Sequence, residues 1–315
     1  MLPGCKVFSI RASSMGEYMR FLLAAVAALV LAACGRSVNN QVESQPTTGI
    51  IGGTLVAEGT TIAQSIVGIY DAKNEAICTG SLIADGIVLT AAHCVFDSEP
   101  NKLQVIFATD VMAVMGTSEP DIKAELMRDV VDFKYHEKYN PDEQEENEFD
   151  WSDIALIKFK GTTPAGYKPA VMLQDPKAVR PGMKAVMAGY GVTSVKTYPV
   201  EARKVKNLKE AIANGDVICD DGYKDCEELS MSGDGELQET YATIAHVVRS
   251  EIRLDESEGR ATCSGDSGGP IFLEQNGQYF IIGVTSRGSM LCNKVGVYTN
   301  VPYYRDWISF NLKKL

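Results

Sequence analysis

Short apolar runs separated by turn residues are the feature of this chain that most constrains its fold. They recur from Ile50 onward, and several end at Gly, Asn or Asp, as strands commonly do. The clearest are QSIVGIYD, GIVLTAA, KLQVIFAT, DIALIKF, KAVMAGYG, GQYFIIGVTS and KVGVYTNV. A helical pattern appears at residues 303–315, where Tyr304, Trp307 and Ile308 have near-helical spacing. The sequence predicts one contiguous, mostly β fold that ends in an α-helix.

Two segments interrupt the succession of predicted strands. Residues 140–151 carry a dense acidic run, which predicts a solvated loop. Residues 201–240 combine a short helical pattern, VKNLKEAIANG, with the loop CDDGYKDCEELSMSGDGE. Cys219 and Cys226 lie seven residues apart in this loop, a spacing that allows a small local ring.

Composition narrows the class of partner. The chain is 45% hydrophobic, which is ordinary for a globular protein with a full core. Its net charge of −11 argues against nucleic acid as a partner, because phosphate binding requires a basic face. The acidity is otherwise typical of a soluble surface.

The N-terminal region predicts export. Residues 21–33 form an unbroken run of 13 apolar residues directly after Arg20. This run is too short to span a bilayer and has the length of a signal-peptide core, although a buried core helix is the alternative. We expect a signal peptide over residues 1–33, with translation starting at Met1 or instead at Met15 or Met19.

The end of this run predicts a lipid anchor. The segment LAACG, at residues 31–35, resembles the lipobox of bacterial lipoproteins, in which cleavage precedes a cysteine that is then lipidated. Cys34 would carry the lipid, and residues 34–49, which are polar, would form a tether or propeptide. The precursor would then lie at a bacterial cell envelope, in contact with the membrane only through this lipid.

The remaining cysteines predict disulfides. Without Cys5 in the signal segment and the lipidated Cys34, six are left, an even number that favours three bridges in an exported protein. Free thiols with metal binding are the alternative, but no Cys-x-x-Cys motif or His-rich cluster supports it. We therefore expect no metal and no cofactor.

Three residues of complementary chemistry stand next to predicted strands. His93 follows one in LTAAHC, Asp153 precedes another in DIALIKF, and Ser267 lies in the glycine-dense turn ATCSGDSGGPIF. Each alone is more often structural than catalytic. Together they provide a nucleophile, a base to activate it and an acid to orient the base.

The motifs LTAAHC, DIALIKF, CSGDSGGP and GVYTNV, in this order, resemble the trypsin/chymotrypsin family of serine proteases over residues 50–315. The resemblance implies two six-stranded antiparallel β-barrels, a C-terminal α-helix and an active site in the cleft between the barrels. It also implies a monomeric endopeptidase that acts on proteins or peptides. The alternative is a catalytically silent binding protein, which the presence of all three residues disfavours.

The same resemblance assigns roles to single residues. Ser267 would be the nucleophile, His93 the general base and then acid, and Asp153 the residue that orients the imidazole. The backbone N–H groups of Gly265 and Ser267 would form the oxyanion hole. Ser286 matches the family serine that bonds the catalytic aspartate. The implied disulfides are Cys78–Cys94 and Cys263–Cys292, and Cys219 with Cys226 would close the local ring that their spacing allows.

The resemblance also outlines a substrate pocket. Ala261 occupies the floor position where trypsin-like members carry an aspartate, and Thr262 follows it. Gly288 and Gly296 match the walls, and Arg287 replaces the tryptophan that is usual there. An open and neutral slot favours a large apolar residue, such as Phe, Tyr, Leu or Met, before the scissile bond (P1).

The segment TTGIIGG resembles the family's zymogen junction. Cleavage between Gly49 and Ile50 would free an α-ammonium that pairs with buried Asp266, a charge that is costly to bury alone. Gly49 is not basic, so we expect an activating protease, not identified by the sequence, that is not trypsin-like. Because residues 35–49 contain no cysteine, the same cut would release the protease from its lipid.

Overall fold

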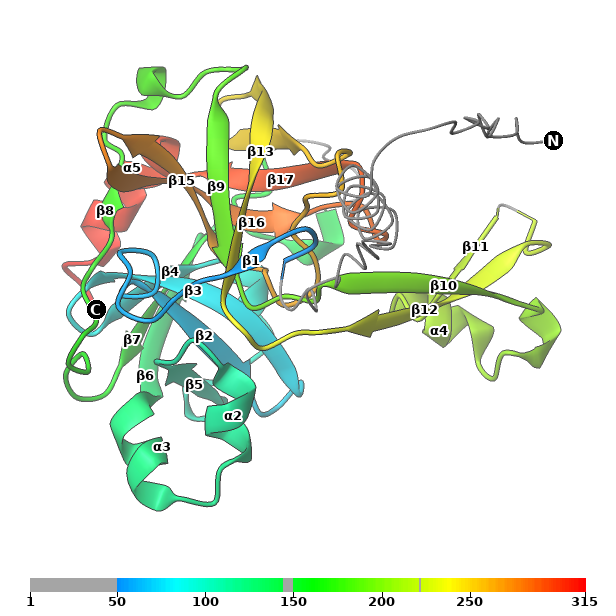
Figure 1. Ribbon diagram of the computed structural model, residues 1–315, viewed down its shortest axis with the longest axis horizontal. Coiled ribbons are helices and arrows are strands. Elements are labelled where there is room, and N and C mark those ends of the chain that lie inside the picture. Colours follow the sequence, from blue (N-terminus) through cyan, green and yellow to red (C-terminus); the bar gives the residue numbers. More distant parts are fainter. Residues whose placement is uncertain (1–49, 144–149, 221) are drawn as a thin grey trace, which may run out of the picture. The chain divides into compact units, whose positions relative to one another are not determined.

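The computed structural model describes residues 50–143, 150–220 and 222–315 (Figure 1). The predicted signal peptide, the lipidated Cys34 and the tether at residues 34–49 lie outside the described residues. Part of the predicted acidic loop, residues 144–149, lies outside them as well. Among the described residues, no helix has the length and hydropathy needed to cross a membrane.

The first half of the domain is a closed six-stranded barrel in the order β2-β3-β4-β7-β6-β5. Every neighbouring pair is antiparallel. The interior is filled by β-branched and leucine side chains such as Ile69, Leu82 and Val105, which are at most 1% exposed. The strands are β2 (Ile66–Asp71), β3 (Ala76–Ala84), β4 (Ile87–Thr90), β5 (Leu103–Ile106), β6 (Met127–Tyr135) and β7 (Ala155–Phe159).

The second half is also a six-stranded antiparallel barrel, with the strand order β13-β14-β17-β16-β15-β9. It is closed because the last strand, β9, pairs with β15 and also with the first strand, β13. Its strands are β9 (Lys184–Gly189), β13 (Gln238–Val247), β14 (Glu251–Asp255), β15 (Pro270–Gln275), β16 (Gln278–Arg287) and β17 (Val295–Asn300). Two short strands extend this sheet, β1 (Thr54–Leu55) and β8 (Val171–Met172). The predicted pair of six-stranded barrels is confirmed.

The predicted C-terminal helix is α5 (Val301–Asn311), which begins two residues before the expected segment. Pro302 stands in its first turn, where a missing N–H costs nothing. Val301, Tyr304 and Ile308 follow helical spacing and are buried in the core cluster formed mainly by the first barrel. The helix therefore closes the β fold through one apolar face.

Between β9 and β13 the chain forms a separate three-stranded sheet, which we call the arm (residues 194–232). It contains β10 (Ser194–Val200), α4 (Leu208–Ala213), β11 (Val217–Cys219) and β12 (Cys226–Ser232). The predicted short helix and the Cys219–Cys226 ring are both present. The strands β10 and β12 were not expected, since their side chains are largely exposed and carry no apolar alternation.

Two short helices in the connection from β5 to β6 were also not expected. They are α2 (Val111–Gly116) and α3 (Pro120–Leu126), of six and seven residues. The Asp110 carboxylate accepts the Ala113 N–H at 2.8 Å and caps α2. Helices of this length are too short to produce a periodic signal. The remaining helical turns are η1 (Ala92–Cys94), η2 (Pro100–Lys102), η3 (Pro141–Glu143), η4 (Pro176–Ala178) and η5 (Ala202–Lys204).

Candidate active site

Strand pairing in the first barrel brings His93 and Asp153 together. His93 follows β4 and Asp153 precedes β7, and these antiparallel strands are paired through Thr90 and Ala155. The end of one strand therefore lies beside the start of the other. The His93 Nδ1 atom lies 2.8 Å from Asp153 Oδ2, and the His93 backbone N–H donates to Asp153 Oδ1 at 3.0 Å.

The second barrel completes the surroundings of this aspartate. Ser286, on β16, donates its hydroxyl to Asp153 Oδ2 at 2.6 Å. Thr299, on β17, donates its hydroxyl to the Asp153 carbonyl at 2.7 Å. Asp153 is 2% exposed, so its ionised carboxylate depends on these donors and on His93.

The two groups of the pair shift each other's pKa. Burial disfavours the charged form of both side chains, but the opposite charge and the hydrogen bond outweigh it. The pKa of Asp153 is therefore lowered, and the pKa of His93 is raised above its ordinary value. The aspartate remains a carboxylate beside an imidazole that readily accepts a proton.

The loop that carries Ser267 is bonded to β3 of the first barrel. The Thr79 N–H donates to the Ser267 carbonyl at 2.8 Å, and the Thr79 hydroxyl donates to the Gly265 carbonyl at 2.8 Å. Thr79 follows Cys78, whose disulfide partner Cys94 is the neighbour of His93. The expected Cys78–Cys94 bridge therefore links the histidine to the strand that holds the serine loop.

The expected oxyanion hole has the required backbone. Within the described part of the chain, no hydrogen-bond acceptor takes the N–H of Gly265 or of Ser267. Gly265 has φ +97°, and a Cβ there would lie 2.8 Å from the Gly191 Cα. Glycine is therefore needed at this position.

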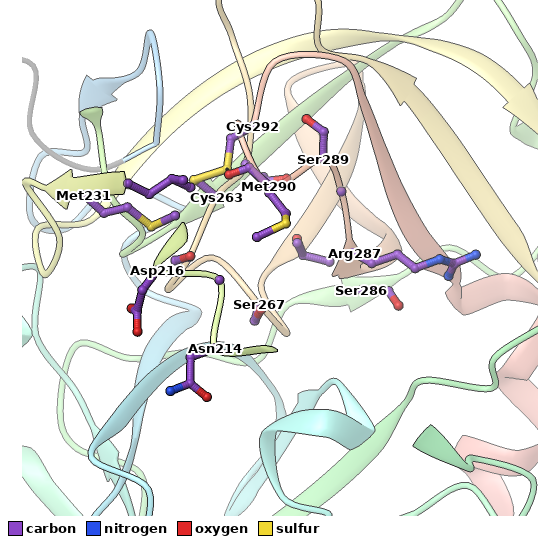
Figure 2. Close-up of a pocket in the computed structure, with 16 residues that line it drawn as sticks. Asn214, Asp216, Met231, Cys263, Ser267, Ser286, Arg287, Ser289, Met290 and Cys292 are labelled. Carbon is purple, nitrogen blue, oxygen red and sulfur yellow. A yellow bond between two sulfur atoms is a disulfide. The ribbon is translucent and has the colours of Figure 1, made fainter. Parts of the chain in front are cut away.

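A cavity of about 480 Å³ opens beside Ser267 (Figure 2). One part of its wall comes from the second barrel and includes Thr262, Ser286 and Gly288. The arm supplies the other part through Asn214, Gly215, Asp216, Leu229 and Met231. The Cys263–Cys292 disulfide, also expected, lies in this wall. The contribution of the arm had no counterpart in the sequence motifs.

Arg287 lines the cavity but directs its charge elsewhere. Figure 2 shows its side chain extending away from Ser267. The guanidinium forms two hydrogen bonds with the Glu251 carboxylate, at 2.9 and 3.0 Å, and stacks 3.8 Å above the Trp151 ring. This bidentate pair uses the planar fork of the guanidinium. The guanidinium is therefore engaged by Glu251 and Trp151.

Two residues expected in the pocket do not line the cavity. Ala261 is 0% exposed, and its backbone pairs with Ile51 through two hydrogen bonds of 3.1 Å. Gly296 faces Glu256, because a Cβ on Gly296 would lie 2.4 Å from Glu256 Oε1. Glu256 is a buried carboxylate that the sequence motifs did not indicate, because it lies before the motif CSGDSGGP and outside the other three.

Ile50 and Asp266 are both completely buried. The Asp266 carboxylate accepts the N–H of Gly191 at 2.8 Å and the N–H of Cys263 at 2.9 Å. A Cβ on Gly189 or Gly191 would lie within 2.3 Å of it. Among the described residues, no Lys, Arg or His forms an ion pair with Asp266. Burial raises its pKa to about 7.

Within the described ranges, the only cluster of metal-ligand side chains is Cys78, His93 and Cys94. Its two sulfur atoms are bonded to each other, so they are not available as thiolate ligands.

The sequence matches the trypsin family over residues 50–308. The chain belongs to the trypsin family. Its domain is a serine endopeptidase domain with the two-barrel fold. The HL collagenase structure has the same fold, with a TM-score of 0.59 at 23% identity, covering 84% of this chain and 99% of the collagenase.

Two relatives extend the comparison. The chain is 30% identical over 245 residues to the CLIP domain-containing serine protease B4 of Anopheles gambiae, covering 75% of this chain. It spans only 62% of the length of that protein. It is 28% identical over 302 residues to the trypsin of Sarcophaga bullata, covering 94% of this chain and 100% of that trypsin.

Gly268 lies where the loop that carries Ser267 packs closely against the first barrel, and a substitution there tests this packing. Its φ is +79°, and a Cβ would lie 2.0 Å from Thr90 Oγ1 and 2.5 Å from the Thr79 carbonyl. We expect Gly268→Ala to lower the free energy of unfolding and to reduce kcat/KM, because the neighbouring Ser267 must shift. Gly277→Ala is the matched control, since Gly277 has φ +77° with nothing within 4 Å of its Cβ position.

The control should cost about 1 kcal/mol of stability from backbone strain alone and leave kcat/KM unchanged. Urea unfolding and peptide hydrolysis measure the two effects. Equal losses of activity in the two variants would show that the close approach of Gly268 to the first barrel is unimportant.

Proposed function

We propose that the protein hydrolyses peptide bonds through a Ser-His-Asp acyl-enzyme mechanism. The observation that carries this proposal is the 2.8 Å contact between His93 and buried Asp153, beside the loop that holds Ser267. Ser267 Oγ attacks the scissile carbonyl and transfers its proton to His93 Nε2. Asp153 holds the other ring nitrogen, Nδ1, so that the correct tautomer faces the serine and the resulting imidazolium is stabilised.

The N–H groups of Gly265 and Ser267 stabilise the oxyanion that forms on the substrate carbonyl. Each such donor contributes about 3–4 kcal/mol to transition-state stabilisation. His93 then gives its proton to the departing amine, and the acyl-enzyme forms. Water, deprotonated by the same histidine, hydrolyses this ester and restores Ser267.

A catalytically silent binding protein is the second candidate. The N–H groups of Gly265 and Ser267, which meet no acceptor among the residues that the structure describes, disfavour it. A protein that only binds gains nothing from leaving two backbone donors without an acceptor next to a serine. The hydrolytic function therefore accounts for more of the geometry.

The proposal includes export and activation by cleavage. Three disulfides support an oxidising compartment outside the cytoplasm. The lipid on Cys34 and the bacterial envelope rest on the lipobox resemblance of residues 31–35 alone. Cleavage after Gly49 releases a monomeric protease from this anchor. The activating protease must accept glycine before the bond that it cleaves.

The activation step is supported by the surroundings of Asp266. Ile50 is already buried in the core of the second barrel, and Ile51 pairs with Ala261 on the segment that leads to the serine loop. A new α-ammonium on Ile50 supplies the cation that the Asp266 carboxylate lacks among the described residues. This ion pair then holds the loop from Cys263 to Ser267 in its active form.

The expected preference for an apolar P1 residue rests on a neutral pocket. Buried Glu256, bonded to the cavity residue Thr262, removes that premise. The proposed hydrolysis therefore does not depend on an apolar P1 residue.

Labelling with a serine-directed phosphonate tests the enzyme directly. We expect the form that begins at Ile50 to be labelled stoichiometrically at Ser267, the uncleaved chain to be labelled much more slowly, and Ser267→Ala not at all. Mass spectrometry of the adduct measures all three. A folded Ile50 form that remains unlabelled would favour the silent binding protein.

The pH dependence of kcat/KM tests the role of the histidine. Protonated His93 cannot accept the serine proton, so activity should fall as the pH drops through a pKa above about 6.5. In Asp153→Asn we expect this apparent pKa to move down and the rate to fall about 10⁴-fold. Asp306→Asn, an exposed position on α5, makes the same chemical change and should keep the original profile. An unshifted profile in Asp153→Asn would contradict the assigned pairing.

Unfolding at different pH values tests the Asp266 switch. In the uncleaved Ser267→Ala chain, a folded pKa of about 7 exceeds the unfolded value of 3.8, so the folded state binds the proton more tightly. The free energy of unfolding should then fall between about pH 4 and pH 7, by at most roughly 4 kcal/mol. Cleavage to Ile50 should weaken this decline, and Asp266→Asn should remove it from both forms. Identical pH dependence in all four samples would refute the switch.

A further inference from the structure

The Glu256 carboxylate lies directly behind the wall of the cavity. It is 2% exposed and follows β14. Its Oε1 atom accepts the Thr262 N–H at 3.2 Å, the Thr262 hydroxyl at 3.0 Å and the Tyr298 hydroxyl at 2.5 Å. Thr262 is itself a lining residue of the cavity, so the carboxylate is bonded directly to the cavity wall.

Gly296 leaves the space that this carboxylate occupies. A Cβ on Gly296 would lie 2.4 Å from Glu256 Oε1 and 2.7 Å from Oε2. The family resemblance makes Gly296 a wall position of the substrate pocket, and a side chain there would point at Glu256. The carboxylate is therefore in the space that a wall side chain would fill.

No positive charge within the described ranges neutralises Glu256. It forms no ion pair there, and Oε2 has no hydrogen-bond donor there. Burial raises the pKa of Glu256 despite its three donors, and the charge of Glu256 in turn raises the pKa of neighbouring Asp266. A buried carboxylate of this kind is stabilised when a cation approaches it.

The lining of the cavity also contains a carboxylate. Asp216 lines it, and the guanidinium of Arg287 is held by Glu251 outside it. A cationic side chain that enters the cavity therefore approaches Asp216 in the lining and Glu256 behind Thr262, while the Arg287 guanidinium is paired with Glu251.

We propose that Glu256 is the primary specificity determinant of this protease and that its carboxylate binds a lysine or arginine side chain at P1. The charge that Ala261 lacks is supplied from five residues earlier in the chain. The P1 ammonium or guanidinium donates to Glu256 Oε2 while Thr262 and Tyr298 hold Oε1. This inference rests on the proposed peptide hydrolysis, because it names the substrate class of the same site.

The experiment compares kcat/KM for peptides that differ only in P1: arginine, lysine or phenylalanine. With the Ile50 form we expect the two basic peptides to be cleaved at least about 100-fold faster than the phenylalanine peptide. Glu256→Gln, which keeps the size of the side chain, should reduce cleavage of the basic peptides about 100-fold or more. Cleavage of the phenylalanine peptide should change less than about threefold.

Glu258→Gln is the matched control. Glu258 lies two residues further on, its side chain is 73% exposed, and it pairs with Arg260 outside the cavity. The variant removes the same formal charge and should preserve the order and the ratio of the three rates. If it lowers the basic rates as much as Glu256→Gln does, the effect is one of net charge and the assignment to Glu256 is overturned.

Glu256→Asp keeps the inference testable if the glutamine variant does not fold. It retains the charge but withdraws it by one methylene, so we expect lysine, the shorter side chain, to lose more than arginine. Binding of benzamidine, a small aryl amidinium, to the Ser267→Ala protein gives a readout that does not depend on turnover. It should bind the otherwise unchanged pocket and be weakened at least about tenfold by either substitution at Glu256.

The outcomes separate this inference from the proposed function. Faster cleavage of the phenylalanine peptide by the parent enzyme, together with normal phosphonate labelling, would overturn the role of Glu256 and leave the protease intact. Equal benzamidine binding with and without the Glu256 carboxylate would also overturn it. Absence of both labelling and turnover with every peptide would instead refute the proposed hydrolysis.

Discussion

The buried carboxylate of Asp153 is the interaction on which the arrangement of the site depends. It receives a backbone and a side-chain contact from His93 in the first barrel and a hydroxyl from Ser286 in the second. An ionised carboxylate with little solvent access requires all of these donors at once. The two barrels therefore cannot shift against each other at this point without leaving a charge unsatisfied. The same constraint that joins the barrels orients the imidazole.

Three of the buried carboxylates in this domain, Asp153, Asp266 and Glu256, differ in where their positive partner comes from. Asp153 has a partner within the fold, and its pKa is lowered. Asp266 and Glu256 have raised pKa values and no cation among the described residues. In our proposals Asp266 acquires its cation from a cut in the chain, and Glu256 acquires its cation from the substrate. Catalysis, activation and selectivity thus each depend on a buried carboxylate. The three carboxylates differ in whether the fold, the new N-terminus or the substrate supplies the positive charge.

The short apolar runs bounded by turn residues predicted the strands and the mostly β fold. The two barrels and the pairing of His93 with Asp153 were implied by the family resemblance of the motifs around them. Glu256 was not predictable in this way. Its importance comes from a glycine 40 positions later, Gly296, whose missing side chain opens the space for its carboxylate. No spacing along the chain records such a contact.

The arm escaped prediction for a different reason. Its strands β10 and β12 are held by backbone pairing from Ser194 opposite Ser232 to Val200 opposite Cys226, and among their residues only Cys226 is buried. A strand without a buried face leaves no apolar alternation in the sequence. The orientation of Arg287 was also not predictable from the sequence, since Arg287 lies on β16 and its partner Glu251 lies on β14 of the second barrel.

The arm has a consequence for how a protease of this kind can diversify. It contributes Asn214, Gly215 and Asp216 to the cavity, yet neither barrel relies on it for closure. Its internal disulfide and its own sheet make it a self-supporting module. Insertions, deletions and substitutions in residues 194–232 can therefore reshape one wall of the cavity while the barrels and the charged groups between them stay as they are. Selection can act on substrate choice here without putting the stability of the enzyme at risk.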